Sequence, residues 1–170
     1  QLEGYLPITN TSLVREDGKG GVIGFVRQGT ETQVLCVSSS NNAERFWLAV
    51  HSDIGPIIVG CWYRPLAARE VNSIDSMPLE LQELEGQYVA KLLIGDCNSH
   101  NKLWLKHSSK NSVEGKQLFR VTQQVGFEQI VRQPTRGKYL LDLVLTDMKG
   151  VTSKVLPAIA DHCCVLLTVL

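Results

Sequence analysis

The stretch LLIGDCNSHNKLW, from Leu92 to Trp104, places a carboxylate and an amide two positions apart directly after an apolar run. The pattern predicts a fully buried strand over 91–95, so Asp96 and Asn98 follow its carboxyl end on a loop. Layered α/β folds place ligand-binding and catalytic groups on loops of this kind. Asp and Asn also form ordinary turns after strands. The motif by itself therefore leaves a purely structural role open.

Three further stretches place polar, chemically active side chains against apolar strands. Asp142 interrupts KYLLDLVLT, where a buried carboxylate needs a partner to offset its desolvation. Asp161 and His162 stand together before the apolar run CCVLLTVL, and Tyr63 lies at the end of PIIVGCWY. Structural alternatives exist: a satisfied core carboxylate for Asp142, a core aromatic for Tyr63 and a surface histidine for His162.

The elements that must position these residues are short. Apolar or alternating runs separated by polar clusters predict a meander of antiparallel strands. The expected strands of this meander cover residues 20–27, 33–37, 45–51 and 56–63. The period then changes, because the spacing of Leu81 and Leu84 and a terminal glycine predict a helix over 76–86. Ser76 or Asp75 is its expected N-cap.

A second helix is expected over 112–125, because its apolar residues share one helical face, and Gly126 should end it. Further strands are expected near 128–131, 140–146, 151–155 and 163–170. Many strands with two helices between them indicate a layered α/β sandwich with the helices outside the sheets. The sequence shows no internal repeat or linker, so residues 1–170 are expected to form one domain.

Composition narrows the class of protein. The chain has 170 residues, of which 44% are hydrophobic, as in one ordinary soluble domain. It shows no apolar stretch long enough for a membrane helix and no signal-peptide pattern, so we expect an intracellular protein. The five cysteines are odd in number and lack CxxC spacing. Reduced thiols are therefore favoured over a disulfide framework or a zinc site.

Charge is unevenly distributed, although the net charge is zero. Residues 1–90 hold 6 Lys and Arg against 11 Asp and Glu, whereas residues 91–170 hold 11 against 6. The expected loops carry the basic residues Lys102, Lys106, Lys110, Arg132, Arg136 and Lys138. Such a group could meet phosphates by charge alone, and an ordinary solvated face is an equally good interpretation.

Four motifs in this order, YRP, GDCN, QPTR followed by LLDLVLTD, and ADH, resemble the endonuclease/exonuclease/phosphatase superfamily, which shares the DNase I fold. DCNSHNKLW and QPTRGKYLLDLVLTD are similar to the endonuclease domain that precedes the reverse transcriptase of non-LTR retrotransposon polyproteins. The resemblance covers nearly the whole chain. It implies a four-layer α/β sandwich of two β-sheets flanked by helices. It also implies Mg²⁺-dependent nicking of one DNA strand to prime reverse transcription, with Mn²⁺ as a substitute metal.

The resemblance implies catalytic roles for five residues. Asp96 would orient or deprotonate the attacking water, and Asn98 would hold that water in line. Asp142 would hold one ring nitrogen of His162, fixing its tautomer and favouring its protonated form. The other ring nitrogen could then bind a phosphate oxygen. Tyr63 would donate a hydrogen bond to the phosphate.

Metal and DNA contacts are implied in the same way. Asp161 would ligate Mg²⁺ directly or through water, because a hard cation prefers oxygen ligands. Thr135 and Arg136 in QPTRGK, together with Lys102, are expected to touch the DNA backbone. For the QPTRGK segment the alternative is an ordinary turn made by Pro134 and Gly137. The expected partners are DNA and a reverse transcriptase domain of the same polyprotein, with the nucleus as the expected compartment and no membrane involved.

The amino-terminal end departs from the family pattern. The family begins with a strand bearing an asparagine, a helix and a strand ending in a metal-binding glutamate, all upstream of the segment GYLPITN. We therefore expect an amino-terminally truncated domain without the first strands, and Glu3 does not take the glutamate's role. Two alternatives stay open: a catalytically impaired remnant of such a domain, and a phosphatase of the same fold that acts on small phosphoesters.

Overall fold

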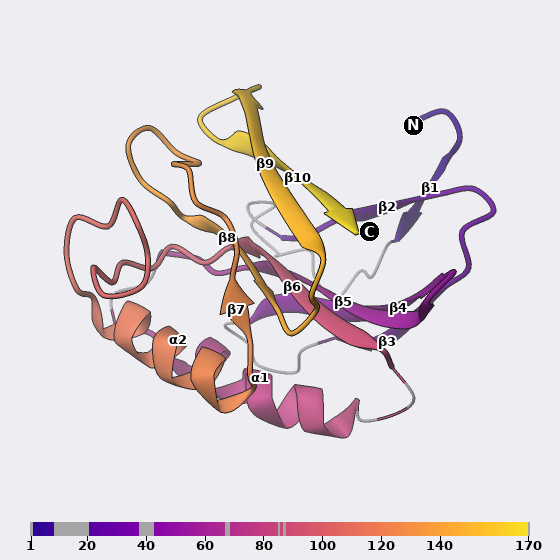
Figure 1. The fold of residues 1–170 in the computed structure, drawn as a ribbon, viewed down its shortest axis with the longest axis horizontal. Coiled ribbons are helices and arrows are strands. Elements are labelled where there is room, and N and C mark those ends of the chain that lie inside the picture. The colour runs from indigo at the N-terminus through magenta and orange to yellow at the C-terminus, as the bar shows by residue number, and fades with distance from the viewer. Residues whose placement is uncertain are drawn as a thin grey trace.

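The described part of the chain is arranged in three layers (Figure 1). The computed structural model describes residues 2–8, 21–37, 43–66, 69–84, 86 and 88–169. Within them, two helices cover one face of a six-stranded sheet, and two separate β-hairpins lie over the other face (Figure 1). No helix in these ranges is long and apolar enough to cross a membrane.

The six-stranded sheet has the strand order β3-β4-β5-β6-β8-β7. Its strands are β3 (Thr32–Val37), β4 (Glu44–Ser52), β5 (Gly55–Tyr63), β6 (Ala90–Asp96), β7 (Glu128–Gln129) and β8 (Asp142–Thr146). Strands β5 and β6 are parallel, and the other neighbours are antiparallel. A parallel pair needs a crossover connection, and α1 (Asn72–Glu83) supplies it. The carboxyl ends of β5 and β6 therefore lie at the same edge of the sheet.

The two hairpins complete the third layer. The first pairs β1 (Tyr5–Ile8) with β2 (Gly24–Arg27), and the second pairs β9 (Val151–Ala158) with β10 (Cys163–Val169). The expected meander is correct for β3, β4 and β5 but wrong for β2, which pairs with β1 instead of β3. Sequence periodicity did not predict β1, because its side chains are mostly exposed and only Ile8 packs onto the sheet.

The helices show how capping sets their bounds. Helix α2 (Val113–Gln124) begins and ends close to the expected positions, with the Ser112 hydroxyl accepting the N–H of Gly115 at 3.0 Å. Helix α1 begins four residues before the expected start, so Ser76 and Asp75 lie inside it rather than at its cap. The reason is Glu70, whose carboxylate accepts the backbone N–H of Ser73 at 2.8 Å and so satisfies the first turn from outside the helix.

A buried ion pair ties α1 to the sheet. Arg45 on β4 is fully buried, and its guanidinium donates to both carboxylate oxygens of Glu80, at 2.8 and 2.7 Å. The indole N–H of Trp47 donates to the same carboxylate at 2.8 Å. These polar groups lie beside the main apolar core of the sheet and helices, which includes Ile58 and Ile74. The network therefore fixes the position of α1 on the sheet.

Replacing Glu80 with Gln should destabilise the fold, because it leaves the buried Arg45 guanidinium without a counter-charge. We expect the free energy of unfolding to fall by about 3 kcal/mol, measured by urea denaturation. Glu83→Gln, an exposed position on the same helix, is the matched control and should change it by less than about 0.5 kcal/mol. Equal effects of the two substitutions would contradict this assignment.

Candidate active site

Four of the polar residues singled out in the sequence meet at one edge of the sheet. Strand pairing places Asp96, the last residue of β6, opposite Asp142, the first residue of β8. His162 directly precedes β10, and its Nδ1 lies 2.8 Å from Asp142 Oδ2. Its Nε2 lies 3.9 Å from Asp96 Oδ2. The predicted contact between Asp142 and His162 is therefore present, and Asp96 lies on the other side of the imidazole.

The loop after β6 holds Asn98 against Asp96. The Asn98 side-chain amide donates to Asp96 Oδ2 at 2.9 Å and to the Arg64 carbonyl at 3.0 Å, while its backbone N–H donates to Asp96 Oδ1 at 3.1 Å. Asn98 has φ of 44°, a left-handed conformation that Asn tolerates better than most residues. Gly95 is required sterically, because a Cβ there would lie 1.7 Å from the Trp62 carbonyl oxygen.

Arg64, to which the sequence assigned no role, stabilises the loop after β6 through hydrogen bonds. Its backbone N–H donates to the Asp96 carbonyl at 2.9 Å, and its guanidinium reaches the Cys97 carbonyl at 3.4 Å. The guanidinium is buried and also lies 3.4 Å from the Glu70 carboxylate. The signal in the sequence was the YRP motif, whose arginine follows directly after an apolar strand. Arg64 thus links the end of β5 to the loop that carries Asp96 and Asn98.

Electrostatics single out Asp96. The pKa of its carboxyl is raised from 3.8 to about 6, mainly by burial and in second place by the nearby negative charge of Asp142. Hydrogen bonds from Asn98 and the charge of His162 act in the opposite direction and lower the pKa, but they do not cancel the effect of burial. The site therefore holds a carboxyl group that changes charge close to neutral pH.

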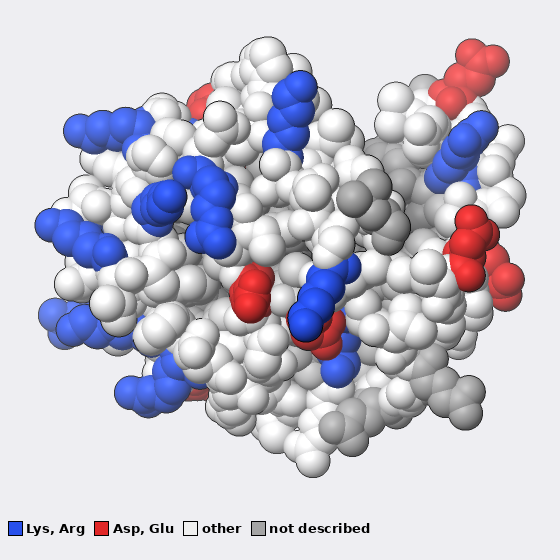
Figure 2. Space-filling view, in the orientation of Figure 1, with Lys and Arg blue, Asp and Glu red and all other residues white. Residues whose placement is uncertain are grey.

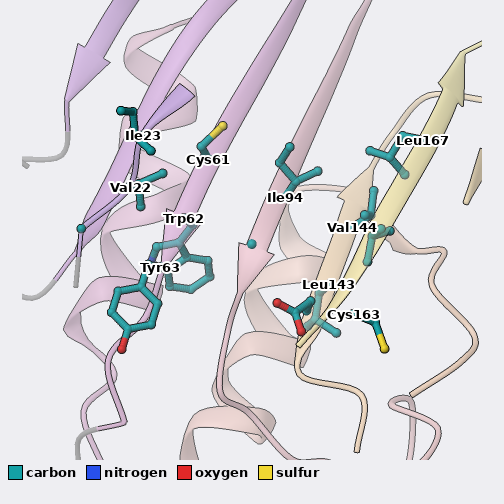
Figure 3. Close-up of a pocket in the computed structure, with 14 residues that line it drawn as sticks. Val22, Ile23, Cys61, Trp62, Tyr63, Ile94, Leu143, Val144, Cys163 and Leu167 are labelled. Atoms are coloured by element: carbon teal, nitrogen blue, oxygen red, sulfur yellow. The ribbon is translucent and has the colours of Figure 1, made fainter. Parts of the chain in front are cut away.

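Tyr63 lies at the same sheet edge, because β5 pairs with β6 so that Tyr63 stands next to Asp96. Beside it is a pocket of about 410 Å³ between the six-stranded sheet and β10. Tyr63 and Cys163 are among the residues that line it, with Cys61, Ile94 and Leu167 farther along its apolar length (Figure 3). The Tyr63 side chain is half-buried and lines the end of the pocket that lies next to Asp96.

Asp161, the residue before His162, forms an ion pair on the surface. Its carboxylate lies 2.8 Å from the Arg136 guanidinium, and its side chain is 68% exposed. Among the residues that the structure describes, no group of three or more His, Cys, Asp or Glu side chains is arranged to hold a metal ion. A single exposed carboxylate still fits Mg²⁺, which often takes one or two protein carboxylates and completes its shell with water and substrate phosphates.

The three residues predicted to contact DNA differ in position. Lys102 and Arg136 are exposed, as a backbone contact requires. Thr135 is completely buried, so the expectation that its side chain touches DNA is wrong. The physical reason is that its hydroxyl accepts the backbone N–H groups of Leu141 and Asp142, at 3.1 and 3.0 Å. This hydroxyl therefore faces inward, toward the strand that carries Asp142.

Two residues near the GDCN loop have structural positions. His100 packs edge-on against Tyr139, with 5.3 Å between ring centroids, and burial lowers the pKa of its imidazole. Trp104 packs against the main core and lies 5.4 Å from the ring of Phe119. His100 therefore contributes to the packing of the loop, and Trp104 contributes to the core.

The layers and the sheet order define a DNase I-like α/β fold, and comparison with solved structures confirms this fold class. The endonuclease domain of TRAS1, a telomere-specific non-LTR retrotransposon, matches with a TM-score of 0.78 and 15% identity, over 96% of this chain and 77% of that one. The human Nocturnin catalytic domain with bound sulfate anion matches with a TM-score of 0.56 and 14% identity, over 97% and 73%. No protein-family model and no curated protein matches the sequence.

Asp96→Asn should stabilise the protein at neutral pH. A carboxyl whose folded-state pKa is raised stabilises the fold most when protonated, so stability is highest below about pH 4 and declines as the pH rises toward 6. Asn is neutral throughout, and we expect a gain on the order of 1 to 3 kcal/mol above pH 6 that disappears below pH 4.

This expectation is checked by urea denaturation between pH 3.5 and 8 in the presence of a chelator, with the exposed Asp53→Asn as control. Asp142→Asn should in addition lower the pKa of Asp96, which can be followed by carboxyl NMR, because it removes the neighbouring negative charge. A pH-independent difference between wild type and Asp96→Asn would contradict the raised pKa.

Proposed function

We propose that this chain is a DNA endonuclease that uses Mg²⁺ to hydrolyse one strand, leaving a 3′ hydroxyl from which reverse transcription is primed. The observation that carries the proposal is the imidazole of His162, hydrogen-bonded to Asp142 at 2.8 Å and facing Asp96 at 3.9 Å. An imidazole held between two carboxylates can bind a phosphate while one of the carboxylates activates water. The likeness to the TRAS1 endonuclease domain supports DNA as the substrate.

The Asp142 and His162 pair would bind the phosphate. An ionised carboxylate can only accept a hydrogen bond, so Nδ1 of His162 carries the proton shared with Asp142. This bond fixes the ring so that Nε2 faces Asp96. When protonated, Nε2 would donate to a non-bridging phosphate oxygen, and the adjacent Tyr63 hydroxyl would donate to another. Both groups would stabilise the negative charge that builds up on phosphorus in the transition state.

Asp96 would accept the proton of the attacking water. Its pKa of about 6 leaves the carboxylate ionised at neutral pH, yet basic enough to take a proton. The amide of Asn98, held against Asp96 at 2.9 Å, would orient the water through its carbonyl oxygen. A bond forms between the water oxygen and phosphorus, the bond from phosphorus to the 3′ oxygen breaks, and the departing 3′ oxygen takes up a proton from solvent.

Asp161 would be the chain's own ligand for Mg²⁺. Its exposed carboxylate supplies one hard oxygen donor, and the bound DNA phosphate and water would supply the others. When bound, the ion would neutralise charge on the phosphate and on the leaving oxygen. Arg136 forms an ion pair with Asp161. If the Asp161 carboxylate bound the metal ion instead, the Arg136 guanidinium would be released and could bind a DNA phosphate.

A basic surface supports a polyanionic substrate. Lys and Arg side chains gather on the left of the view, over α2 and the neighbouring loops, whereas the right-hand edge of the same view shows more Asp and Glu (Figures 1 and 2). Lys102, in the loop between β6 and α2, and Arg136, in the loop before β8, are both exposed. Both loops are continuous with the strands that carry Asp96 and Asp142. Phosphates on either side of the bond that is cut could therefore meet positive charge.

The proposal is tested by nicking of supercoiled plasmid with and without Mg²⁺. His162→Ala and Asp142→Asn should each lower the nicking rate at least about 100-fold, since they remove a transition-state contact or its support. His51→Ala, an exposed histidine on β4, is the matched control and should nick at the wild-type rate. Hydrolysis of inositol phosphates or other small phosphoesters with no plasmid nicking would overturn the choice of substrate in favour of a phosphatase.

Lys102→Ala should weaken DNA binding independently of sequence. If Lys102 neutralises one phosphate, the slope of log affinity against log salt concentration should fall by about 0.9 for duplex DNA. Fluorescence anisotropy with a labelled duplex in a chelating buffer, titrated at several salt concentrations, measures the slope without cleavage. Lys154→Ala, exposed on β9, is the control and should keep the wild-type slope. An unchanged slope for Lys102→Ala would remove Lys102 from the DNA surface.

A further inference from the structure

Thr135 occupies a central position between the motif loops. Its side chain is completely buried, and its hydroxyl oxygen accepts two consecutive backbone N–H groups, from Leu141 at 3.1 Å and Asp142 at 3.0 Å. One buried oxygen therefore holds the backbone at the exact start of the strand that carries Asp142. Because one hydroxyl oxygen accepts both hydrogen bonds, the position of the Leu141 and Asp142 backbone is closely defined.

The main chain of Thr135 reaches the other half of the pair. Its carbonyl accepts the N–H of Cys163, the residue after His162, at 2.7 Å. Its own N–H donates to the Tyr139 carbonyl at 2.8 Å, which closes the turn before Asp142. A single residue thus holds the backbone next to both partners of the hydrogen bond between Asp142 and His162, which lie 20 positions apart in the chain.

The sheet does not supply this support by itself. Strand β7 pairs with only Leu145 and Thr146 of β8, and a further backbone bond from Ile130 reaches the Val144 carbonyl. In the described residues, the β7 side of β8 has no strand partner at Asp142. The Thr135 hydroxyl, rather than a strand, accepts the N–H of Asp142 on this side. The Leu141 carbonyl in turn accepts the N–H of Cys97 at 3.0 Å, so the same segment also holds the loop between Asp96 and Asn98.

We infer that Thr135 is a positioning residue, whose hydroxyl sets the distance between Asp142 and His162 and thereby the geometry of phosphate cleavage. The inference rests on the proposed function for its kinetic consequence, but the positioning itself does not depend on catalysis. Without the hydroxyl, two buried N–H groups lose their acceptor, and the backbone of Leu141 and Asp142 must move to find another. The 2.8 Å contact of Asp142 with His162 would then lengthen or be lost.

The test compares Thr135→Val, which keeps the shape but removes the acceptor, with Thr135→Ser, which keeps the acceptor. Thr146→Val is the matched control, because Thr146 lies on the same strand, is buried and accepts the N–H of Met148 through its hydroxyl at 3.0 Å. All variants are first checked for folding by circular dichroism. If Thr135→Val does not fold, Thr135→Cys, with a thiol that accepts more weakly, replaces it in the comparison with Thr135→Ser.

Two measurements are made on each variant. The first is the NMR signal of the His162 Nδ1 proton, which reports the hydrogen bond to Asp142 without any substrate. The second is nicking kinetics with Mg²⁺. For Thr135→Val we expect the proton signal to disappear and kcat to fall roughly 10- to 100-fold with KM changed less than about twofold. Thr135→Ser and Thr146→Val should keep both the signal and kcat close to wild type.

The outcomes separate this inference from the proposed function. Loss of the signal in Thr135→Val alone supports the positioning role even if the wild-type chain nicks no DNA, in which case only the proposed function fails. A retained signal together with wild-type kcat in Thr135→Val overturns the inference. An equal loss in Thr146→Val also overturns it, because the effect would then come from removing any buried hydroxyl of this strand.

Discussion

The position of strand β6 between a parallel and an antiparallel neighbour is the constraint on which the site depends. Because β5 runs parallel to β6, the two strands end at the same edge and place Tyr63 beside Asp96. Because β8 runs antiparallel, its first residue, Asp142, falls at that same edge. Strand pairing thus brings together three polar side chains from distant parts of the chain.

Bringing two carboxylates side by side has an energetic cost that the surrounding residues offset. Asp96 is partly buried next to Asp142, and both effects favour its neutral form. Asn98 and His162 offset part of this cost by donating hydrogen bonds or positive charge. The remaining imbalance leaves the pKa of Asp96 close to neutral, where a carboxyl group serves best as a proton acceptor. The same arrangement that weakens the fold at this edge therefore suits it for chemistry.

The groups that hold the site are themselves buried and polar. Arg64 braces the loop after β6, and Thr135 braces the start of β8, each through hydrogen bonds to backbone atoms. Such contacts fix the backbone, while the side chains that would act on a substrate remain partly accessible. Farther away, the Arg45 and Glu80 pair fixes α1, the crossover that makes the parallel pairing of β5 and β6 possible. Support for the site thus extends from its loops to the helix layer.

The sequence by itself predicted the strands β3 to β6, helix α2 and the polar residues that meet at the sheet edge, because apolar periodicity and motif order depend on neighbours along the chain. It predicted that Asp142 would pair with His162. Only the tertiary structure showed that β2 pairs with β1 and that Ile8 of β1 packs against the sheet. Likewise, Glu70 caps α1 from outside the predicted helix. Thr135 is buried because its hydroxyl meets Leu141 and Asp142, and contacts of this kind appear only when the chain has folded back on itself.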